Sequence, residues 1–157
     1  MAATDPQVDP PRGIFPAKVD DKGRLKLPAN FHEYLQSLGT TKTFITTLDK
    51  ATCKIYTISA WNANLKLLEG AADKKAAEAL RFRASDWGQD SDLDPQGRLM
   101  LPTDLRRHLK MENAPVWMQA GDGYIDVLNE ELYRQRKLKS DETLDGKMDY
   151  FLELGLK

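Results

Sequence analysis

The sequence has few of the residues that disulfides and metal sites require, and it has no long apolar stretch of the kind that spans a membrane. It contains one cysteine and two histidines in 157 residues. A single cysteine excludes a disulfide within the chain and fits a reducing cytosol. No apolar stretch approaches the roughly 20 residues that a transmembrane helix needs. Prolines and acidic residues interrupt residues 1–12, which therefore do not resemble a signal peptide.

The few residues with ligating or catalytic potential are badly placed for such chemistry. His32 and His108 have no cysteine or histidine at ligand spacing, so no metal site is expected. Cys53 lies in a predicted strand with no histidine nearby, which favours core packing over nucleophilic catalysis. The sequence has no P-loop or GxGxxG pattern, and nothing in it resembles a catalytic triad. We therefore predict a protein that is not an enzyme and that needs no cofactor.

The composition is that of an ordinary globular protein. Hydrophobic residues make up 41% of the chain and charged residues 30%. The length suits one domain or two small intertwined ones. A formal net charge of −1 gives no general cationic character that would favour nucleic acid, although a local basic patch still could.

One ten-residue pattern occurs twice. Residues 19–28 read VDDKGRLKLP, and residues 93–102 read LDPQGRLMLP. Six residues recur at an offset of 74: Asp20, Gly23, Arg24, Leu25, Leu27 and Pro28 return as Asp94, Gly97, Arg98, Leu99, Leu101 and Pro102. A recurrence of this kind in a short chain indicates a duplicated structural unit.

Each copy predicts a turn, a short strand and the start of a helix. The glycine follows polar residues and can adopt a positive φ without a Cβ clash, which marks a turn. The next four residues alternate, so Leu25 and Leu27 lie on one face and Arg24 and Lys26 on the other. Proline then ends the strand and suits the first turn of a helix.

The surrounding sequence extends this prediction to the whole chain. In the first copy we expect strands over 14–19, 24–27, 43–48 and 54–58. We also expect a helix that starts at Pro28, with Phe31, Tyr34, Leu35 and Leu38 on its apolar side and Gly39 as its C′ residue. Ser59 is the expected N-cap of a helical stretch over 61–80, with Gly70 as a candidate break. In the second copy we expect a strand ending at Leu93, strands over 98–101, 116–119 and 124–128, a helix over 102–110 and a cap at Asn129. The offset falls to 70 there, so the second copy has lost four residues. A final helix is predicted over 144–156.

At the repeated motif the chain resembles the MraZ family of bacterial regulators, which are built from two SpoVT/AbrB-type modules. Both DDKGR and DPQGR match the Asp-x-x-Gly-Arg motif of that family, and both precede an apolar strand and Leu-Pro. The similarity extends roughly over 13–137, and the acidic, proline-rich start differs from the family. The resemblance implies an α+β fold in which two pseudo-twofold modules exchange hairpins to form one compact β-barrel with peripheral helices.

The resemblance also implies a domain organisation. Residues 1–12 form an extension that we expect to be disordered, because it holds almost nothing apolar to bury. The first module covers 13–59, a connecting helical segment 60–85 and the second module 86–137. Residues 138–157 remain as a C-terminal tail with helical character.

Basic residues gather around both copies. Residues 12–26 contain five cations and two anions, and residues 98–110 contain four cations and one anion, a balance of +3 in each. Such spots suit phosphate contact, although charged residues beside turns can also form a merely solvated face. The predicted DNA-binding residues are Arg24, Arg98, Lys22, Lys26 and Lys18. Among these residues the arginines are the strongest candidates, because a rigid guanidinium can bind guanine bidentately or clamp a phosphate.

The other motif residues are expected to be structural. Asp20 and Asp94 should cap their turns or pair with the arginine four residues later, since an aspartate repels phosphate. Gly23 and Gly97 should allow the turn and a close approach of the backbone to a ligand.

The MraZ resemblance implies a cytoplasmic, nucleoid-associated transcription factor with no membrane partner. It would regulate the division and cell wall gene cluster by binding direct repeats in double-stranded DNA, its own promoter included, as a ring-shaped homo-oligomer. Trp61, Leu65 and Leu68 could pack between neighbouring subunits or within the core. Two alternatives stay open. One is a structural or protein-interaction barrel that binds an acidic partner. The other is an AbrB-type antitoxin, which the long insert between the repeats disfavours.

Overall fold

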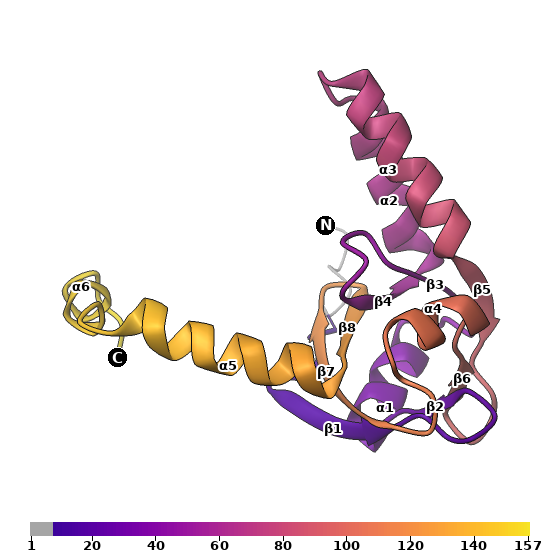
Figure 1. Ribbon diagram of the computed structural model, residues 1–157, viewed down its shortest axis with the longest axis horizontal. Helices are drawn as coiled ribbons and strands as arrows, with labels where there is room; N and C mark the ends of the chain where they lie inside the picture. Colours follow the sequence, from indigo (N-terminus) through magenta and orange to yellow (C-terminus); the bar gives the residue numbers. More distant parts are fainter. Residues whose placement is uncertain (1–7) are drawn as a thin grey trace, which may run out of the picture.

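The strands of the two copies are exchanged within one antiparallel sheet. The computed structural model describes residues 8–157, so most of the predicted N-terminal extension lies outside the described residues. The first half contains β1 (Ile14–Lys18), β2 (Arg24–Lys26), α1 (Ala29–Ser37), β3 (Lys42–Thr46), β4 (Cys53–Thr57), α2 (Ile58–Glu69) and α3 (Lys74–Trp87). The second half contains β5 (Gln89–Asp92), β6 (Arg98–Met100), α4 (Thr103–His108), β7 (Pro115–Gly121), β8 (Tyr124–Leu128), α5 (Glu130–Leu144) and α6 (Met148–Glu153) (Figure 1). The predicted α+β class is confirmed.

The main sheet has six strands in the order β1-β7-β8-β4-β3-β5. The first strand of each copy pairs with the other copy: β1 with β7, and β5 with β3. Neither copy could build this sheet alone, because a few short strands and one helix leave an apolar face uncovered. The exchange therefore makes each half depend on the other for its core.

The register reveals an approximate twofold relation between the copies. In the separate two-stranded ribbon of β2 and β6, Leu25 lies opposite Leu99, its own equivalent at an offset of 74. In the main sheet, Ile55 lies opposite Ile125, an offset of 70. A residue faces its own counterpart only where a twofold axis passes between them. The two offsets inferred from the sequence therefore belong to two points on one pseudo-twofold axis.

The strands do not form one closed barrel among the described residues. They form an open six-stranded sheet and a two-stranded ribbon, linked by the Val19–Leu25 bridge and by a 3.0 Å bond from Asp94 N to Arg98 O. The ribbon strands have only three residues each, because a glycine turn precedes each strand and a proline, which cannot donate to a ladder, follows it.

The core is built from equivalent apolar residues of both copies. Leu25, Leu99, Phe31 and Leu105 are at most 1% exposed, and Leu109 is 3% exposed. Cys53 is fully buried in β4, where desolvation raises the pKa of its thiol to about 12, so its predicted core role is confirmed. Leu38 differs from the prediction. It is 39% exposed, because α1 ends at Ser37 and Gly39 follows with φ +68 as the expected C′ residue.

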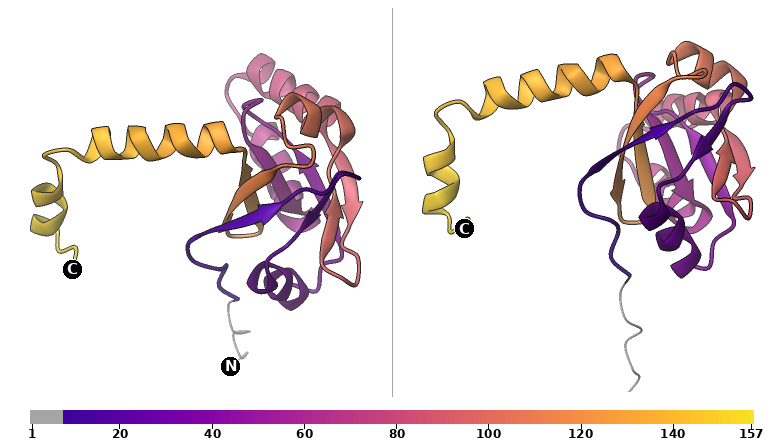
Figure 2. Two further views of the ribbon diagram at one scale, coloured as in Figure 1. Left: turned by 60° about the horizontal axis from the view of Figure 1, so that its bottom comes forward. Right: turned by 90° about the horizontal axis from the view of Figure 1, so that it is seen from below.

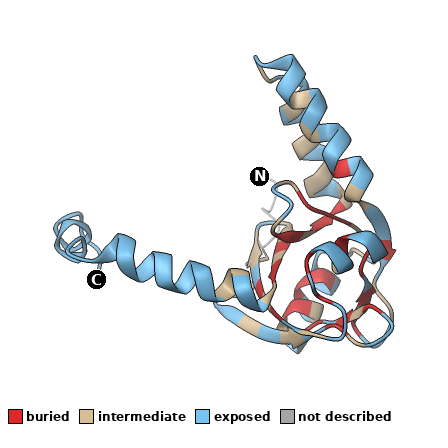
Figure 3. Ribbon diagram, in the orientation of Figure 1, coloured by how far each residue is buried: buried red, intermediate tan, exposed pale blue. Residues whose placement is uncertain are grey.

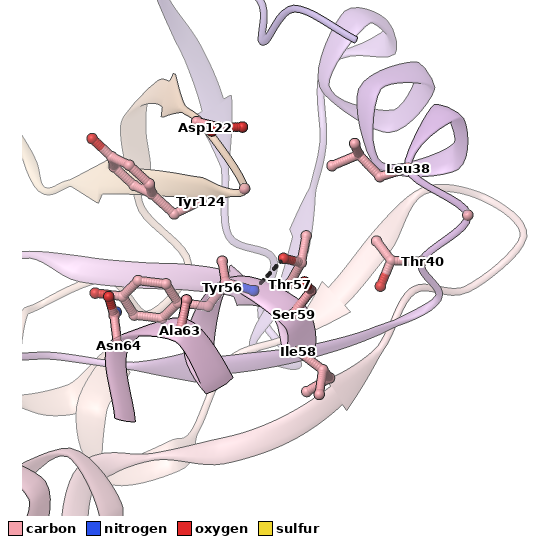
Figure 4. A pocket seen from close by; sticks show the side chains of 13 residues that line it. Leu38, Thr40, Tyr56, Thr57, Ile58, Ser59, Ala63, Asn64, Asp122 and Tyr124 are labelled. Atoms are coloured by element: carbon pink, nitrogen blue, oxygen red, sulfur yellow. Dashed lines mark hydrogen bonds between the residues drawn. The ribbon is translucent and has the colours of Figure 1, made fainter. Parts of the chain in front are cut away.

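The predicted cap at Ser59 is wrong. Thr57 caps α2, and its Oγ1 accepts a hydrogen bond from Ala60 N at 3.1 Å (Figure 4). The backbone N–H of Thr57 donates to Gly123 O in the β7–β8 turn, so the ladder with β8 ends there and the helix begins two residues early. Asn129 caps α5 as predicted, accepting from Leu132 N at 2.8 Å. Gly70 ends α2, which confirms the candidate break.

The C-terminal region forms a projecting arm. The predicted helix over 144–156 is wrong in its start, because α5 runs to Leu144 and Gly146, at φ +69, separates it from the six-residue α6. Tyr133 stacks on Trp117 with ring centroids 4.6 Å apart and fixes the base of α5 to the sheet. Beyond it the arm leaves the body in every view (Figures 1 and 2), and it is almost wholly exposed (Figure 3). No helix in the described part of the chain is long and apolar enough to cross a membrane.

Candidate nucleic-acid interface

The β2–β6 ribbon turns one face to the core and one to solvent. Leu25 and Leu99 are fully buried. Because side chains alternate along a strand, the residues on either side of each leucine point outward. The ribbon lies on the side of the body opposite to α5 (Figures 1 and 2). Its outer face, which we call the ribbon face, consists of Arg24, Lys26, Arg98 and Met100.

Each motif aspartate binds the backbone and side chain of its arginine. Asp20 Oδ1 accepts from Lys22 N at 3.0 Å and from Arg24 N at 2.8 Å, and its Oδ2 accepts from Arg24 Nε at 2.8 Å. Asp94 makes the same bonds to Gln96 N, Arg98 N and Arg98 Nε, at 3.0, 2.8 and 2.8 Å. A carboxylate that bonds both the turn and the guanidinium fixes where the arginine points.

These bonds lower the pKa of both aspartates. For Asp20, the hydrogen bond from the Arg24 backbone is the largest cause, and the guanidinium adds to it against partial desolvation. For Asp94, desolvation raises the pKa, but the bonds from the Arg98 backbone and side chain outweigh it. Because folding lowers both pKa values, the stabilisation is complete above the ordinary aspartate pKa and is lost as the pH falls through the lowered values.

The arginines keep their outer edges available. The side chains of Arg24 and Arg98 are both 30% exposed. Among the hydrogen bonds within residues 8–157, none uses an Nη atom of Arg24, and Nη2 of Arg98 makes one long bond of 3.3 Å to Gln96 Oε1. The bond through Nε holds each guanidinium while its Nη donors can still reach a bidentate acceptor.

The predicted lysines do not all gather at one point. Lys26 lies on the ribbon face, and its Nζ donates to Gln96 O in the turn of the second copy. Lys22 is exposed in the turn of the first copy, and Lys18 is exposed at the end of β1. The ribbon therefore brings Arg24, Arg98 and Lys26 together, while the other two lysines border it.

Both motif glycines adopt positive φ under a side chain of the opposite copy. Gly23 has φ +84, and a Cβ there would lie 2.4 Å from Arg106 Cζ. Gly97 has φ +77, and a Cβ there would lie 2.8 Å from His32 Nδ1. His32 and Arg106 are themselves separated by 74 residues. Each covers the other copy's turn, a role that the sequence prediction missed although the offset marked the two positions as equivalent.

The second basic spot is partly neutralised. Arg106 Nε lies 3.4 Å and Arg107 Nε 3.2 Å from Glu112 Oε1, an anion just beyond the stretch whose charge balance was counted. Arg106 is 14% exposed, and its Nη1 donates to Leu101 O at 2.8 Å. It therefore supports the turn of the first copy, and the cationic surface centres on the ribbon face.

One pocket of the body lies away from the motif residues. A pocket of about 660 Å³ opens between the end of α1, the β4–α2 junction and the β7–β8 turn (Figure 4). None of the predicted DNA-binding residues lines it. Within the described residues no three histidine, cysteine or acidic side chains gather as metal ligands would.

These features define a class: an internally duplicated α+β protein whose paired Asp-x-x-Gly-Arg turns present arginines on a two-stranded ribbon. No family model matches the chain. It is 33% identical over 125 residues to the transcriptional regulator MraZ of Acidobacterium capsulatum, covering 79% of this chain and 85% of that protein. It is 28% identical over 147 residues to MraZ of Pediococcus pentosaceus, covering 92% and 98%, and 30% identical over 130 residues to MraZ of Legionella pneumophila, covering 80% and 84%. The chain belongs to the MraZ family, whose named members are transcriptional regulators and not enzymes.

Proposed function

We propose that this protein is a sequence-specific DNA-binding transcriptional regulator that contacts double-stranded DNA through the ribbon face. The observation that carries the proposal is the duplicated aspartate–arginine pair, which presents two oriented guanidinium groups beside the pseudo-twofold axis. A two-stranded ribbon fits the major groove of B-DNA. Arg24 and Arg98 would read guanine or clamp phosphates, and Lys26, Lys22 and Lys18 would add phosphate contacts.

The remaining motif residues would hold this face in shape. Asp20 and Asp94 would orient the arginines, and Gly23 and Gly97 would permit the turns. The protein would need no metal or cofactor for this function. The exchange of β1 and β5 between the copies supports an assignment of the halves as SpoVT/AbrB-type modules over 13–59 and 86–137. The helices of 60–85 would connect them, and residues 138–157 would form a tail.

The protein would act as a ring-shaped homo-oligomer. One supporting observation is the amount of apolar surface on the projecting helices: Leu67, Phe82, Leu138, Tyr150 and Leu154 are each at least 60% exposed. Exposed apolar side chains mark an interaction surface where they form a contiguous patch. Trp61 is no such candidate, because it packs within the chain against Phe44 and Tyr56, with ring centroids 4.8 and 5.1 Å apart.

The membership in the MraZ family supports a target. The regulated genes would be the division and cell wall cluster, and the operator would consist of direct repeats in the protein's own promoter. The protein would accordingly be found in the cytoplasm, associated with the nucleoid.

A gel shift with the duplex upstream of the protein's own gene tests the proposed function. We expect a specific complex whose log affinity falls linearly with log salt concentration, by about 0.9 per phosphate neutralised. The control is a shuffled duplex of equal length and base composition, which should bind more weakly at every salt concentration. Equal binding of the two duplexes would contradict a sequence-specific regulator. No binding to either would favour a structural barrel or one that recognises an acidic protein.

The spacing of the operator repeats tests the ring. The ribbon face of one protomer offers a small contact area for DNA. Several linked ribbon faces gain affinity by binding together, but only if their spacing matches the spacing of the operator repeats. Inserting about 5 base pairs between two repeats should weaken binding strongly, because half a helical turn moves the second repeat to the far side of the duplex. Inserting about 10 base pairs should cost less, because the repeat returns to the same side. Equal affinity for the native and half-turn operators would mean that each repeat is bound independently.

A further inference from the structure

The two arginines of the ribbon face are related by the pseudo-twofold axis and are identical, but its other two residues differ. Lys26 and Met100 occupy equivalent positions at the offset of 74. Arg98 lies opposite Lys26, and Arg24 lies opposite Met100. One end of the face therefore carries two cations, while the other carries one cation and a methionine that is 43% exposed.

The turns next to the two ends differ as well. Leu27 N donates to Gly97 O at 2.9 Å, so the Arg98–Lys26 end adjoins the turn of the second copy. Lys26 Nζ donates to Gln96 O in that same turn, which fixes the position of the ammonium group. Leu101 N donates to Gly23 O at 3.0 Å, so the Met100 end adjoins the turn of the first copy. At this end β6 carries methionine instead of lysine, and the ammonium group nearest in sequence is that of Lys22 in the adjoining turn.

We infer that Lys26 and Met100 make DNA recognition directional. Resting on the proposed function, this inference assigns the two residues to opposite halves of one binding site. The thioether of Met100 is apolar and suits contact with the 5-methyl group of a thymine in the major groove. The ammonium of Lys26 suits a phosphate or the O6 and N7 acceptors of guanine. The arginines read the two half-sites alike, and these two residues read them differently.

A directional face has a consequence for assembly. A perfectly twofold face binds a duplex equally well in both orientations, so it cannot tell a direct repeat from an inverted one. A face with unequal ends prefers one orientation on each repeat. Protomers that share one orientation in an assembly then require repeats that share one direction. Within the ribbon face, the difference between Lys26 and Met100 supplies this preference, and outside it the counterparts of Lys18 and Lys22 are Asp92 and Gln96, which differ as well.

Selection from duplexes with a randomised centre two helical turns long tests the inference with the whole protein. Wild type should enrich a motif whose two halves differ. Met100→Lys should enrich a motif that is close to palindromic next to the arginine contacts, because both ends then carry lysine. Lys26→Met should also enrich a near-palindrome, because both ends then carry methionine, and its two halves should resemble the half-site that Met100 reads in the wild type. Met148→Lys adds the same charge to a methionine that is 47% exposed on α6, and it should leave the wild-type motif unchanged.

Salt titration on the selected wild-type duplex gives a second readout. The slope of log affinity against log salt should decrease in magnitude by about 1 for Lys26→Met, as expected for one lost phosphate contact. All variants change exposed residues, so their unfolding midpoints should match wild type. A wild-type motif that is itself palindromic, or a motif unchanged by Met100→Lys, would overturn the inference while leaving DNA binding intact. Failure of the wild type to enrich any sequence would instead overturn the proposed function.

Replacement of thymine by uracil tests the Met100 contact on the unmodified protein. Uracil lacks only the 5-methyl group, so substitution at the contacted position should weaken binding by about fourfold, the effect of one buried methyl group. The same substitution in the Lys26 half-site should change affinity little. Met100→Ala should bind the thymine and uracil duplexes equally. Equal wild-type affinity for uracil-substituted and native duplexes at every thymine of the motif would contradict the contact.

Discussion

Replacing both Arg24 and Arg98 by alanine should lower operator affinity by about 2–6 kcal/mol, since each bidentate contact is worth about 1–3 kcal/mol. Each guanidinium is held through Nε by its aspartate at 2.8 Å, so the Nη donors are oriented before DNA arrives. An oriented group loses little conformational entropy on binding, and alanine removes the whole contact. The measurement is fluorescence anisotropy with the operator duplex, made for each single variant and for the double variant.

The fold should survive this change. The aspartates left behind are 34% and 30% exposed and keep their bonds to the turn backbone, and partly exposed ion pairs contribute little to stability. Far-UV circular dichroism should therefore be unchanged. Arg134→Ala is the matched control, because this arginine is 73% exposed and pairs with Glu130 on α5, away from the ribbon. Wild-type affinity in the double variant would remove the assignment of the arginines to DNA recognition.

The local structure of this protein could be predicted because it depends on residues close in sequence. Gly23 and Gly97 specify their turns through a backbone conformation that few other residues adopt, and both have positive φ in the structure. The alternation in RLKL predicted the burial of Leu25 and Leu27, and both are at most 2% exposed. These signals act over a few residues, so the copies could be aligned without knowledge of the fold.

The parts that depend on long-range contacts could not be predicted in the same way. Thr57 rather than Ser59 caps α2 because Gly123, 66 positions later, ends the ladder with β8. Glu112 lies just past the counted basic stretch and bonds both Arg106 and Arg107. Neither fact follows from spacing alone, because each depends on a turn or a helix end that brings separated residues together.

The residues of the site also differ in whether they could be predicted from nearby sequence. The arginines and aspartates of the motif were predicted as candidates from sequence, and their paired geometry follows from a four-residue spacing. The support of each turn by the opposite copy was missed, because it requires the exchange of strands across the pseudo-twofold axis. The offset of 74 between His32 and Arg106 was the available signal. The same offset relates the helices that follow the two motifs, and it makes these two positions equivalent.

Replacing Gly23 by valine should destabilise the protein more than the same change at Gly39. Both glycines have positive φ, +84 and +68, and a non-glycine residue held there costs on the order of 1–3 kcal/mol. A Cβ at Gly39 would meet nothing within 4 Å, whereas at Gly23 it would lie 2.4 Å from Arg106 Cζ. Arg106 could retreat only by giving up its 2.8 Å bond to Leu101 O. The free energy of unfolding, measured by urea titration, should therefore fall further for Gly23→Val.

The Gly39→Val variant thus measures backbone strain alone, and the difference between the two variants measures the contact between the copies. Gly97→Val should resemble Gly23→Val, because His32 covers it in the same way. Asp20→Asn should cost less than either, since asparagine can still accept the bonds from the Lys22 and Arg24 backbones. Equal losses at Gly23 and Gly39 would show that Arg106 adds nothing to the turn. A soluble Gly97→Val protein that assembles and unfolds like wild type would show that the positive φ is not required, and the ribbon face would then need another source of rigidity.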